Sequence, residues 1–437
     1  MKYIFLLFYV VFVFLMFREV CRLINNGNSK EAMIGLFMSF ALVPDFIIFD
    51  AYGIPGTFII VFLFMCLIPF IGIIKSHILR FRRGDVFFII MIAVIFVYAL
   101  YTKYVKGIIT DYYDTKLFGY IYTLIIPIIV IMHYKESIIK SYDLWKPILL
   151  YAIIAYAFKN FFLAGVLGFR NTYVTNYEEL KNVIFAARIL AIGVVICIYD
   201  LLRRYEFKTL IYIAILLLQI LLFESRGPIL SVVLSTMIIW WFRSGKEKFK
   251  KHFNPRLLIG LSAFVVLAIV GFKYLWDAGY LERMVYKMNM FTTGNRNETR
   301  YYLYPITVEA IKQHMPWGLG FGNTKIGVMS INGYFNNNYP HNIILEMLLE
   351  EGIFITIPVL VILIRWFGSI ITKDRYSYNT LLFFTLYVFS FVNSMFSGDI
   401  VGNSNLFFFG YLAYCSKLMS SNETVIDVRE KTVGGYI

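Results

Sequence analysis

Charged residues, cysteine and histidine are scarce in this sequence of 437 residues. Only 16% of its residues are charged, whereas 59% are hydrophobic and the mean hydropathy is +0.70. Because soluble domains carry about 25% charged residues, this composition excludes water as the main solvent. The four cysteines stand singly, without CxxC or Cys/His ligand spacing, so we predict no disulfide framework, metal site or haem attachment.

Repeats, low-complexity stretches and paired broken segments are absent as well. Transporter cores usually show such repeats or paired broken segments, so the sequence does not indicate a transporter core. No stretch indicates a separate soluble domain either. Alternation of polar and apolar residues over about ten positions is also missing, which excludes the strands of a transmembrane barrel. We therefore predict an all-α protein in which residues 1–437 form a single integral membrane domain.

Apolar stretches of about 15 to 23 residues recur along the chain, close to the roughly 20 helical residues that cross a bilayer. They predict a polytopic bundle of about 12–13 spans. The first stretch is expected to remain as a helix, because Arg18 and Glu19 stand where a cleavage site would need small residues. The predicted spans cover residues 3–17, 32–49, 54–74, 85–102, 117–134, 147–165, 183–199, 209–223, 228–242, 257–276, 342–364, 379–396 and 405–419.

The distribution of basic residues predicts the topology. One set of alternate connections holds 25 of the 41 lysines and arginines, and the other holds 14. Since cytoplasmic loops retain basic residues, the richer set is predicted to be cytoplasmic. This places the amino terminus outside, residues 277–341 in a large external loop and residues 420–437 in a cytoplasmic tail. The net charge of +14 is then a topology signal that also attracts anionic lipid, and we expect no nucleic-acid partner.

The external loop is predicted to be ordered, because it is rich in aromatic residues and disordered segments are not. Pro305 is expected to begin a short helix that runs towards Gln313. The stretch from Met315 to Gly322 predicts a rigid turn, in which the amides beside Gly318 and Gly320 could approach a ligand closely. A purely structural turn is the alternative.

Three polar residues in or beside predicted spans are candidates for chemistry. His341 precedes a span and could act as a general base, the alternative being an interfacial histidine bound to the backbone. Arg226 lies in a short external turn, where its guanidinium suits a phosphate; an ion pair with Glu224 or contact with lipid phosphate is the alternative. Arg188 falls within a span, where charged residues are rare and usually face a polar cavity.

Three carboxylates follow His341 in the same predicted span, namely Glu346, Glu350 and Glu351. At that depth each of them needs a partner or a proton. They could orient an arginine or histidine, or form a salt bridge with an external lysine.

Taken in order, several of these elements resemble the O-antigen polymerase and O-antigen ligase superfamily. They are Ser225-Arg226-Gly227 at the start of a span, a large external loop with Arg300, Pro316-x-Gly-x-Gly, His341-Asn342 and Glu351-Gly352. The resemblance covers roughly residues 183–365. Tyr304 stands where the family usually has tryptophan, and Met315 looks like an extra residue, so Arg296 is the neighbouring candidate for the position of Arg300.

The resemblance implies a C-type glycosyltransferase that needs neither metal nor cofactor and acts at the outer face of a bacterial cytoplasmic membrane. Its donor and acceptor would be glycans linked through pyrophosphate to undecaprenol. The family's arginines, which would hold the pyrophosphate, match Arg226 and Arg300, with Arg296 as the neighbouring candidate for Arg300, and the family's base matches His341. Arg188 is a further candidate for the pyrophosphate by its position in a span alone. Asn342, Glu351, Gly318 and Gly320 would support them.

The preferred function is a polymerase that joins lipid-linked repeat units into O-antigen or capsule. A ligase that transfers finished glycan to a lipid A-core acceptor is the first alternative, and a non-enzymatic flippase for the same lipids is the second. Membrane lipid, a chain-length regulator and a separate flippase would be partners of the polymerase.

Overall fold

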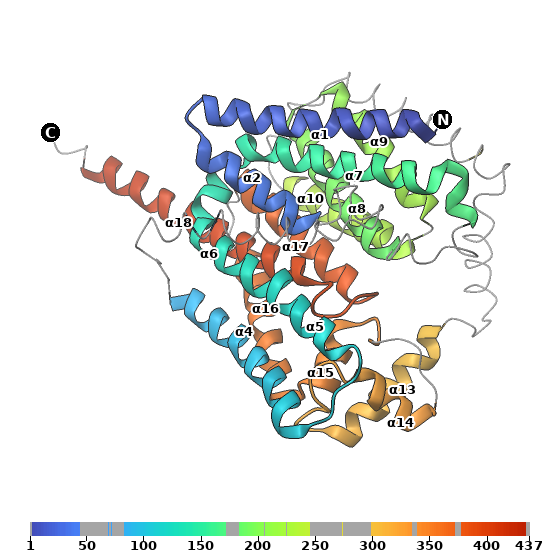
Figure 1. The fold of residues 1–437 in the computed structure, drawn as a ribbon. Coiled ribbons are helices and arrows are strands. Elements are labelled where there is room, and N and C mark those ends of the chain that lie inside the picture. The colour runs from blue at the N-terminus through green and yellow to red at the C-terminus, as the bar shows by residue number, and fades with distance from the viewer. Residues whose placement is uncertain are drawn as a thin grey trace. The chain divides into compact units, whose positions relative to one another are not determined.

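The protein is helical throughout the part of the chain that the structure describes. This computed structural model describes residues 2–43, 69, 71, 83–171, 183–204, 206–223, 225–244, 273, 299–333, 339–371 and 377–433. These ranges contain no β-strand, which confirms the predicted all-α architecture (Figure 1).

Six of the described helices are long and apolar enough to cross a membrane, so the chain is a polytopic helical membrane protein. Two shorter apolar helices, Phe207–Leu222 and Arg226–Ile238, accompany them. The predicted spans 54–74 and 257–276 lie almost wholly outside the described residues. The six long helices cover Tyr3–Asn25, Asp85–Lys106, Tyr113–Lys140, Tyr142–Leu163, Ile184–Arg203 and Ile353–Ile371.

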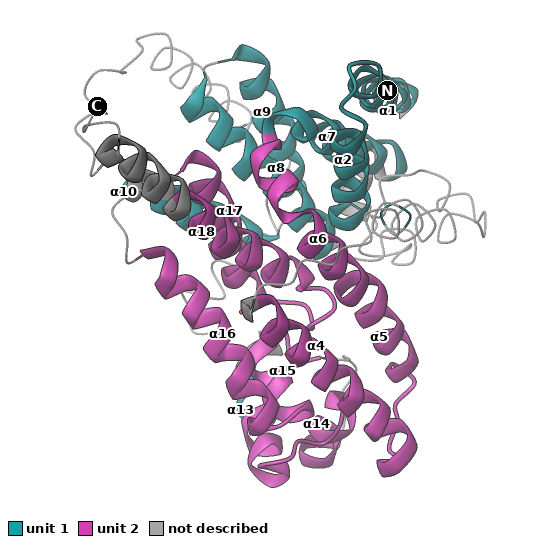
Figure 2. Cartoon of the chain, turned by 90° about the vertical axis from the view of Figure 1, so that its left-hand side faces the viewer, with its two compact units in different colours: residues 1–71, 143–305 teal, residues 72–142, 306–437 magenta. Residues whose placement is uncertain are grey.

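The chain forms two compact units, each built from two segments that are distant in sequence (Figure 2). Unit 1 contains residues 1–71 and 143–305, and unit 2 contains residues 72–142 and 306–437. The boundary at residue 305 falls inside α13 (Thr299–His314).

Unit 1 is a bundle of apolar helices held together by aromatic stacking and close helix contacts. The Phe5 and Phe161 rings stack at 5.2 Å, and Phe8 stacks on Phe158 at 5.1 Å, which joins α1 to α7. Helices α9 and α10 pack on α8, and α2 packs on α1 and, through Gly35, on α7. The helices of unit 1 are α1 (Lys2–Asn25), α2 (Ser29–Leu42), α7 (Tyr142–Asn171), α8 (Val183–Arg203), α9 (Phe207–Leu222) and α10 (Arg226–Ser244).

Gly193 lets α8 approach both of its neighbours closely. A Cβ atom at this position would lie 2.8 Å from Ile153 Cγ2 of α7 and 2.9 Å from Leu216 Cδ1 of α9. Near the other end of α7, Lys146 Nζ lies 2.8 Å from Asp200 Oδ2. These contacts fix the antiparallel register between α7 and α8.

Unit 2 is centred on α16 and α18. A Cβ atom at Gly410 of α18 would lie 2.8 Å from both Trp366 of α16 and Tyr387 of α17, so the three helices pack tightly. The Phe88 ring of α4 meets Trp366 edge-on at 4.9 Å. The elements of unit 2 are α4 (Arg83–Tyr101), π-helix η3 (Thr102–Lys106), α5 (Tyr113–Gly119), π-helix η4 (Tyr120–Ile125), α6 (Ile126–Lys140), α14 (Thr324–Asn332), α15 (Ile343–Glu350), α16 (Ile353–Ile371), α17 (Tyr378–Ser394) and α18 (Ser404–Val433).

A buried polar group also joins three helices of unit 2. Lys135 of α6 binds Asp85 of α4, and both contact the Tyr411 hydroxyl of α18, at 3.0 Å from Lys135 Nζ and 2.6 Å from Asp85 Oδ1. All three side chains are buried, and each is satisfied by the other two.

Two details of the predicted elements were wrong. The expected span 342–364 is two helices, α15 and α16, separated by Glu351 and Gly352, because Gly352 adopts a left-handed φ of 75° that ends α15. In addition, α13 begins at Thr299 and runs through Pro305, whereas we expected the helix to begin at this proline. An internal proline removes one helical hydrogen bond but does not end α13.

Candidate functional site

Arg226 is the first residue of α10, and its side chain is half-buried. Only a short turn separates it from the end of α9 at Leu222, and Ile220 of α9 and Ile229 of α10 line one pocket, so Arg226 lies near the end of α9. A helix amino terminus offers free amides and a weak positive field, which favour an anion beside the guanidinium. The alternative partner Glu224 lies outside the described residues.

Arg188 lies near the same end of unit 1. It is the sixth residue of α8, so it is about 8 Å from the helix start, and it is buried. Because α8 and α9 are antiparallel and Gly193 faces Leu216, Arg188 lies level with the last turn of α9. Thus Arg188 and Arg226 are at the same end of the α8–α9–α10 bundle.

Lys159 is a second buried cation at the level of Arg188. Ile153 of α7 faces Gly193 of α8, so advancing α7 by six residues brings Lys159 level with Arg188. Asn160 is buried beside Lys159 in sequence. Arg188 and Lys159 are therefore buried cations at the same level of unit 1, and Arg226 lies at the start of α10 towards this end.

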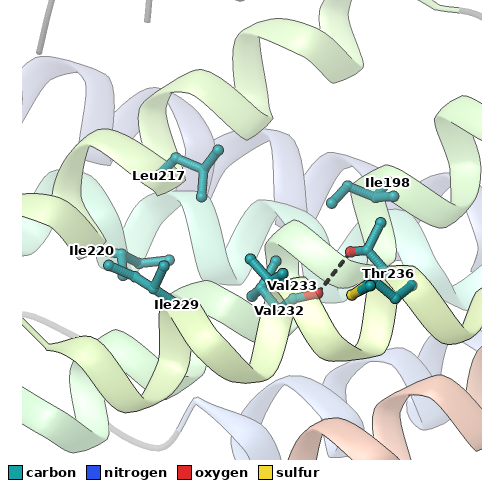
Figure 3. Close-up of a pocket in the computed structure, with 8 residues that line it drawn as sticks. Ile198, Leu217, Ile220, Ile229, Val232, Val233 and Thr236 are labelled. Atoms are coloured by element: carbon teal, nitrogen blue, oxygen red, sulfur yellow. Dashed lines mark hydrogen bonds between the residues drawn. The ribbon is translucent and has the colours of Figure 1, made fainter.

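An apolar groove of about 500 Å³ runs along α10 from that end (Figure 3). Its first α10 residue, Ile229, follows Arg226 by three positions, and the groove reaches Met237 about two turns further on. Thr236 contributes a polar side-chain atom, its hydroxyl oxygen, to the lining. This hydroxyl donates a hydrogen bond to Val232 O at 2.7 Å within the helix. The lining residues come from three helices and are Ile198, Leu217, Ile220, Ile229, Val232, Val233, Thr236 and Met237.

Arg300 is the second residue of α13, in the first turn of this helix. Its alternative Arg296 lies outside the described residues. The structure therefore gives Arg300 a helical position in the predicted external loop.

His341 and Asn342 form the entry to α15 in unit 2. His341 has a left-handed φ of 62°, which is uncommon for a residue other than glycine. Asn342 is the N-cap, and its Oδ1 accepts hydrogen bonds from Ile344 N at 3.0 Å and Leu345 N at 3.1 Å. The His341 ring meets the Tyr339 ring edge-on at 4.9 Å. Backbone strain of this kind persists where the surroundings impose it, and it clusters at functional sites.

The turn from Pro316 to Gly322 is bound to the joint between α15 and α16. Leu319 N donates to Leu349 O at 2.7 Å, and Ile353 N donates to Pro316 O at 2.9 Å. Gly318 and Gly352 both have a φ of 75° and lie back to back, so that a Cβ atom on either would clash with the backbone of the other segment. The close approach that we predicted for Gly318 is made to protein backbone.

Gly320 has a similar packing reason. Its φ is 118°, its N–H donates to Glu350 O at 2.9 Å, and a Cβ atom would lie 2.6 Å from Thr102 Cγ2. The next amide, Phe321 N, donates to Thr102 Oγ1 at 3.1 Å. The glycine turn is thus fitted between η3 and α15.

Glu346 and Glu350 bind one lysine, Lys116 of α5, which answers the two alternatives that the sequence left open. Lys116 Nζ lies 2.5 Å from Glu350 Oε2 and also binds Glu346 Oε1. All three side chains are buried. Glu350 additionally accepts hydrogen bonds from Gly322 N at 2.6 Å and from Thr324 Oγ1 at 2.7 Å. Its carboxylate therefore also provides hydrogen-bond acceptors for the end of the glycine turn.

The third carboxylate, Glu351, is also buried, but it lacks the hydrogen-bond partners of the other two in the part of the chain that the structure describes. Its side chain is 2% exposed, and neither carboxyl oxygen has a hydrogen-bond partner among the described residues. Burial raises the pKa of Glu351 well above its ordinary value, and the neighbouring Glu350 raises it further. Burial thus favours the neutral, protonated form of the Glu351 carboxyl over its charged form.

Sequence reasoning missed Lys116 because a lysine just before an apolar run usually lies at the lipid head groups. It also missed Thr102 and Thr324, whose residue types carry no signal. One signal for Lys116 was available: Glu346 and Glu350 are four residues apart, so they share a helix face and can bind one cation.

No group of three His, Cys, Asp or Glu side chains in the described ranges could hold a metal ion. Independence from metals and cofactors stays a prediction.

Comparison with known families identifies the central part of the chain. Residues 211–360 match the family model described as O-antigen ligase. The match includes Arg226, Arg300, His341 and Glu351, whereas Arg188 lies outside it. No curated protein matches the chain. Residues 211–360 of this multi-pass membrane protein are therefore similar to the O-antigen ligase family, which supports a relation to the O-antigen ligase and polymerase superfamily.

Proposed function

We propose that the protein is a polymerase that joins undecaprenyl-pyrophosphate-linked repeat units into O-antigen or capsular polysaccharide, at the outer face of the cytoplasmic membrane. One observation carries the proposal: within the matched segment, Arg226 lies at the head of an apolar groove. A guanidinium next to an apolar channel suits a ligand that has a phosphate head and a long hydrocarbon tail.

The groove supports a polyprenyl tail in particular. It extends about 12 Å along α10, from Ile229 to Met237, and its lining is aliphatic apart from Thr236 and Met237. Val233 and Met237 are 50% and 60% exposed, so the groove reaches the surface of unit 1. A lipid tail can therefore enter sideways from the bilayer.

The reaction needs a proton acceptor and a place for negative charge. The acceptor sugar hydroxyl loses its proton to a base, its oxygen bonds to the anomeric carbon of the donor glycan, and the bond from that carbon to the pyrophosphate oxygen breaks. The leaving group, undecaprenyl pyrophosphate, keeps the electron pair. In this proposal His341 takes the proton, and Arg226 and Arg300 stabilise the leaving pyrophosphate, with Arg188 near Arg226.

A ligase is the second candidate function, because the matching family model is described as O-antigen ligase. The chemistry on the donor is the same, and only the acceptor differs: lipid A-core instead of a second lipid-linked glycan. The same groove and Arg226 would serve both reactions.

Deleting the gene and separating the lipopolysaccharide by size tests the proposal. A polymerase predicts one residual repeat unit on the core, whereas a ligase predicts bare core. Restoring the gene with His341→Ala or with Arg226→Ala should leave the deletion pattern unchanged while the protein remains in the membrane. A non-enzymatic flippase would instead tolerate both substitutions, and full-length polymer in both strains would reject the proposed enzyme.

A further inference from the structure

The buried ion cluster of unit 2 includes two residues of the helix that follows the predicted base. It consists of Lys116 of α5 with Glu346 and Glu350 of α15, and we call it the Lys116 cluster. Helix α15 begins at Ile343, two positions after His341. Anything that moves α15 along or about its axis therefore moves the backbone of His341.

Helix α15 cannot fix its own position. It has 8 residues, whereas isolated helices shorter than about 12 residues are marginal. Its amino end holds His341 in a left-handed conformation, which costs about 1 to 2 kcal/mol for a residue with a Cβ atom. Tertiary contacts must therefore determine both the place of α15 and the strain at His341.

Lys116 provides such tertiary contacts through its Nζ atom. Its Nζ binds Glu346 and Glu350, which are one helical turn apart, and it lies 4.9 Å from the centre of the Phe321 ring. Glu346 Oε1 also accepts a long hydrogen bond from Ile400 N at 3.4 Å, in the connection between α17 and α18. The Lys116 cluster thus ties α15 to α5, to the glycine turn and to the α17–α18 connection.

The side chain of Lys116 has no exposed surface, so it cannot touch a substrate directly. Stability is also a weak reason for such a cluster, since buried ion groups can often be replaced by neutral ones without loss. What a neutral replacement cannot reproduce is the directional pull of one cation on two carboxylates.

We propose that Lys116 is a positioning residue for His341, acting through Glu346 and Glu350 to fix the place of α15. This inference rests on the proposed function, because it assumes that His341 is the base. A shift of about 1 Å at a reacting group can lower a rate by roughly a hundredfold.

The decisive variant removes all charge from the Lys116 cluster: Lys116→Met combined with Glu346→Gln and Glu350→Gln. Lys116→Met alone would leave two unpaired buried carboxylates and is expected to prevent folding. The neutral triple variant should accumulate in the membrane. Its kcat should fall by roughly ten- to a hundredfold, with the KM for the donor within about twofold of the wild-type value.

Initial rates are measured in membranes, per mole of protein, with the lipid-linked repeat unit purified from the host as the donor. The matched control is Lys135→Met with Asp85→Asn, which neutralises the other buried ion group of unit 2 without touching α15. This control should keep the wild-type kcat. A wild-type kcat in the triple variant would overturn the positioning role.

Two further outcomes are informative. If the wild-type protein itself transfers no glycan, this result rejects the proposed function, and it is distinguishable from a failure of the positioning role of Lys116. If the triple variant does not accumulate, Lys116→Arg decides, because it keeps the charge while its longer, forked head shifts both carboxylates. A lowered kcat at unchanged KM supports the positioning role, and a wild-type kcat rejects it.

Discussion

The two units of the protein place the charged residues of interest in different surroundings. In unit 1 the candidate cations, Arg226 and Arg188, lie at one end of the α8–α9–α10 bundle, and an apolar groove begins three residues after Arg226. In unit 2 the Lys116 cluster and the Lys135–Asp85 pair are ion groups whose members bind one another inside the protein. A charged residue in a membrane protein thus points to a ligand when it lies at a helix end beside an apolar channel, and to the architecture when its partners are buried with it.

The largest expected effect concerns the packing of unit 2. Gly352→Ala should destabilise the protein by about 2 to 5 kcal/mol, because it adds a left-handed strain of about 1 to 2 kcal/mol and an overpacking term of about 1 to 3 kcal/mol. Thermal unfolding in detergent measures the loss. Gly333→Ala is the matched control, since Gly333 has a φ of 70° but nothing within 4 Å, and it should lose only about 1 to 2 kcal/mol. Equal losses would contradict the back-to-back packing of Gly352 and Gly318.

The next effect tests unit 1 as the place where charge serves the substrate. Arg226→Ala should lower the transfer rate by roughly a hundredfold, because a charge-stabilising donor is lost. Arg226→Lys should recover only part of the rate, since an ammonium cannot grip phosphate bidentately. Arg204→Ala is the control, because Arg204 is an exposed arginine just beyond the opposite end of α8. Rates in membranes decide, and an unchanged rate for Arg226→Ala would contradict the assignment.

A smaller effect should follow from filling the groove. Val233→Trp places a large ring in the lining, and we expect the KM for a long-chain donor to rise by roughly tenfold, equal to about 1.4 kcal/mol of binding free energy. A donor with a short prenyl chain should be less affected. Leu230→Trp is the matched control, because Leu230 is an exposed residue of the same helix that does not line the groove. If both variants behave alike, the groove does not bind the tail.

The smallest effect is a change in how stability depends on pH. Burial raises the pKa of Glu351 in the folded protein, so the folded state binds more protons than the unfolded state above the ordinary glutamate pKa of about 4.3. Stability from this group therefore falls as pH rises above that value, until the folded pKa is passed. Glu351→Gln should remove this loss, so that the variant gains stability over the wild type at pH 8 and little at pH 4. Unfolding temperatures at the two values measure it; an equal gain at both would show that Glu351 does not titrate.

The helical membrane fold followed from composition, because a run of about 20 apolar residues has few alternatives to a spanning helix. The points where individual helices begin and end were harder to predict. Gly352 divides one predicted span into α15 and α16 through its backbone conformation, which hydropathy does not report. Similarly, Pro305 was a good candidate for a helix start, yet α13 runs through it.

The sequence by itself determined the solvent, the secondary structure and the polar residues that merit testing: Arg226, Arg188, Arg300 and His341 stand out because charge and polarity are rare in such a chain. Only the tertiary structure decided what surrounds them. It brought Arg188 and Arg226 to one end of a bundle, placed an apolar groove beside Arg226, and paired Glu346 and Glu350 with Lys116, more than 200 residues earlier. The physical reason is that hydrophobicity is a local property of a segment, whereas partner choice depends on helix register and packing, which no single segment contains.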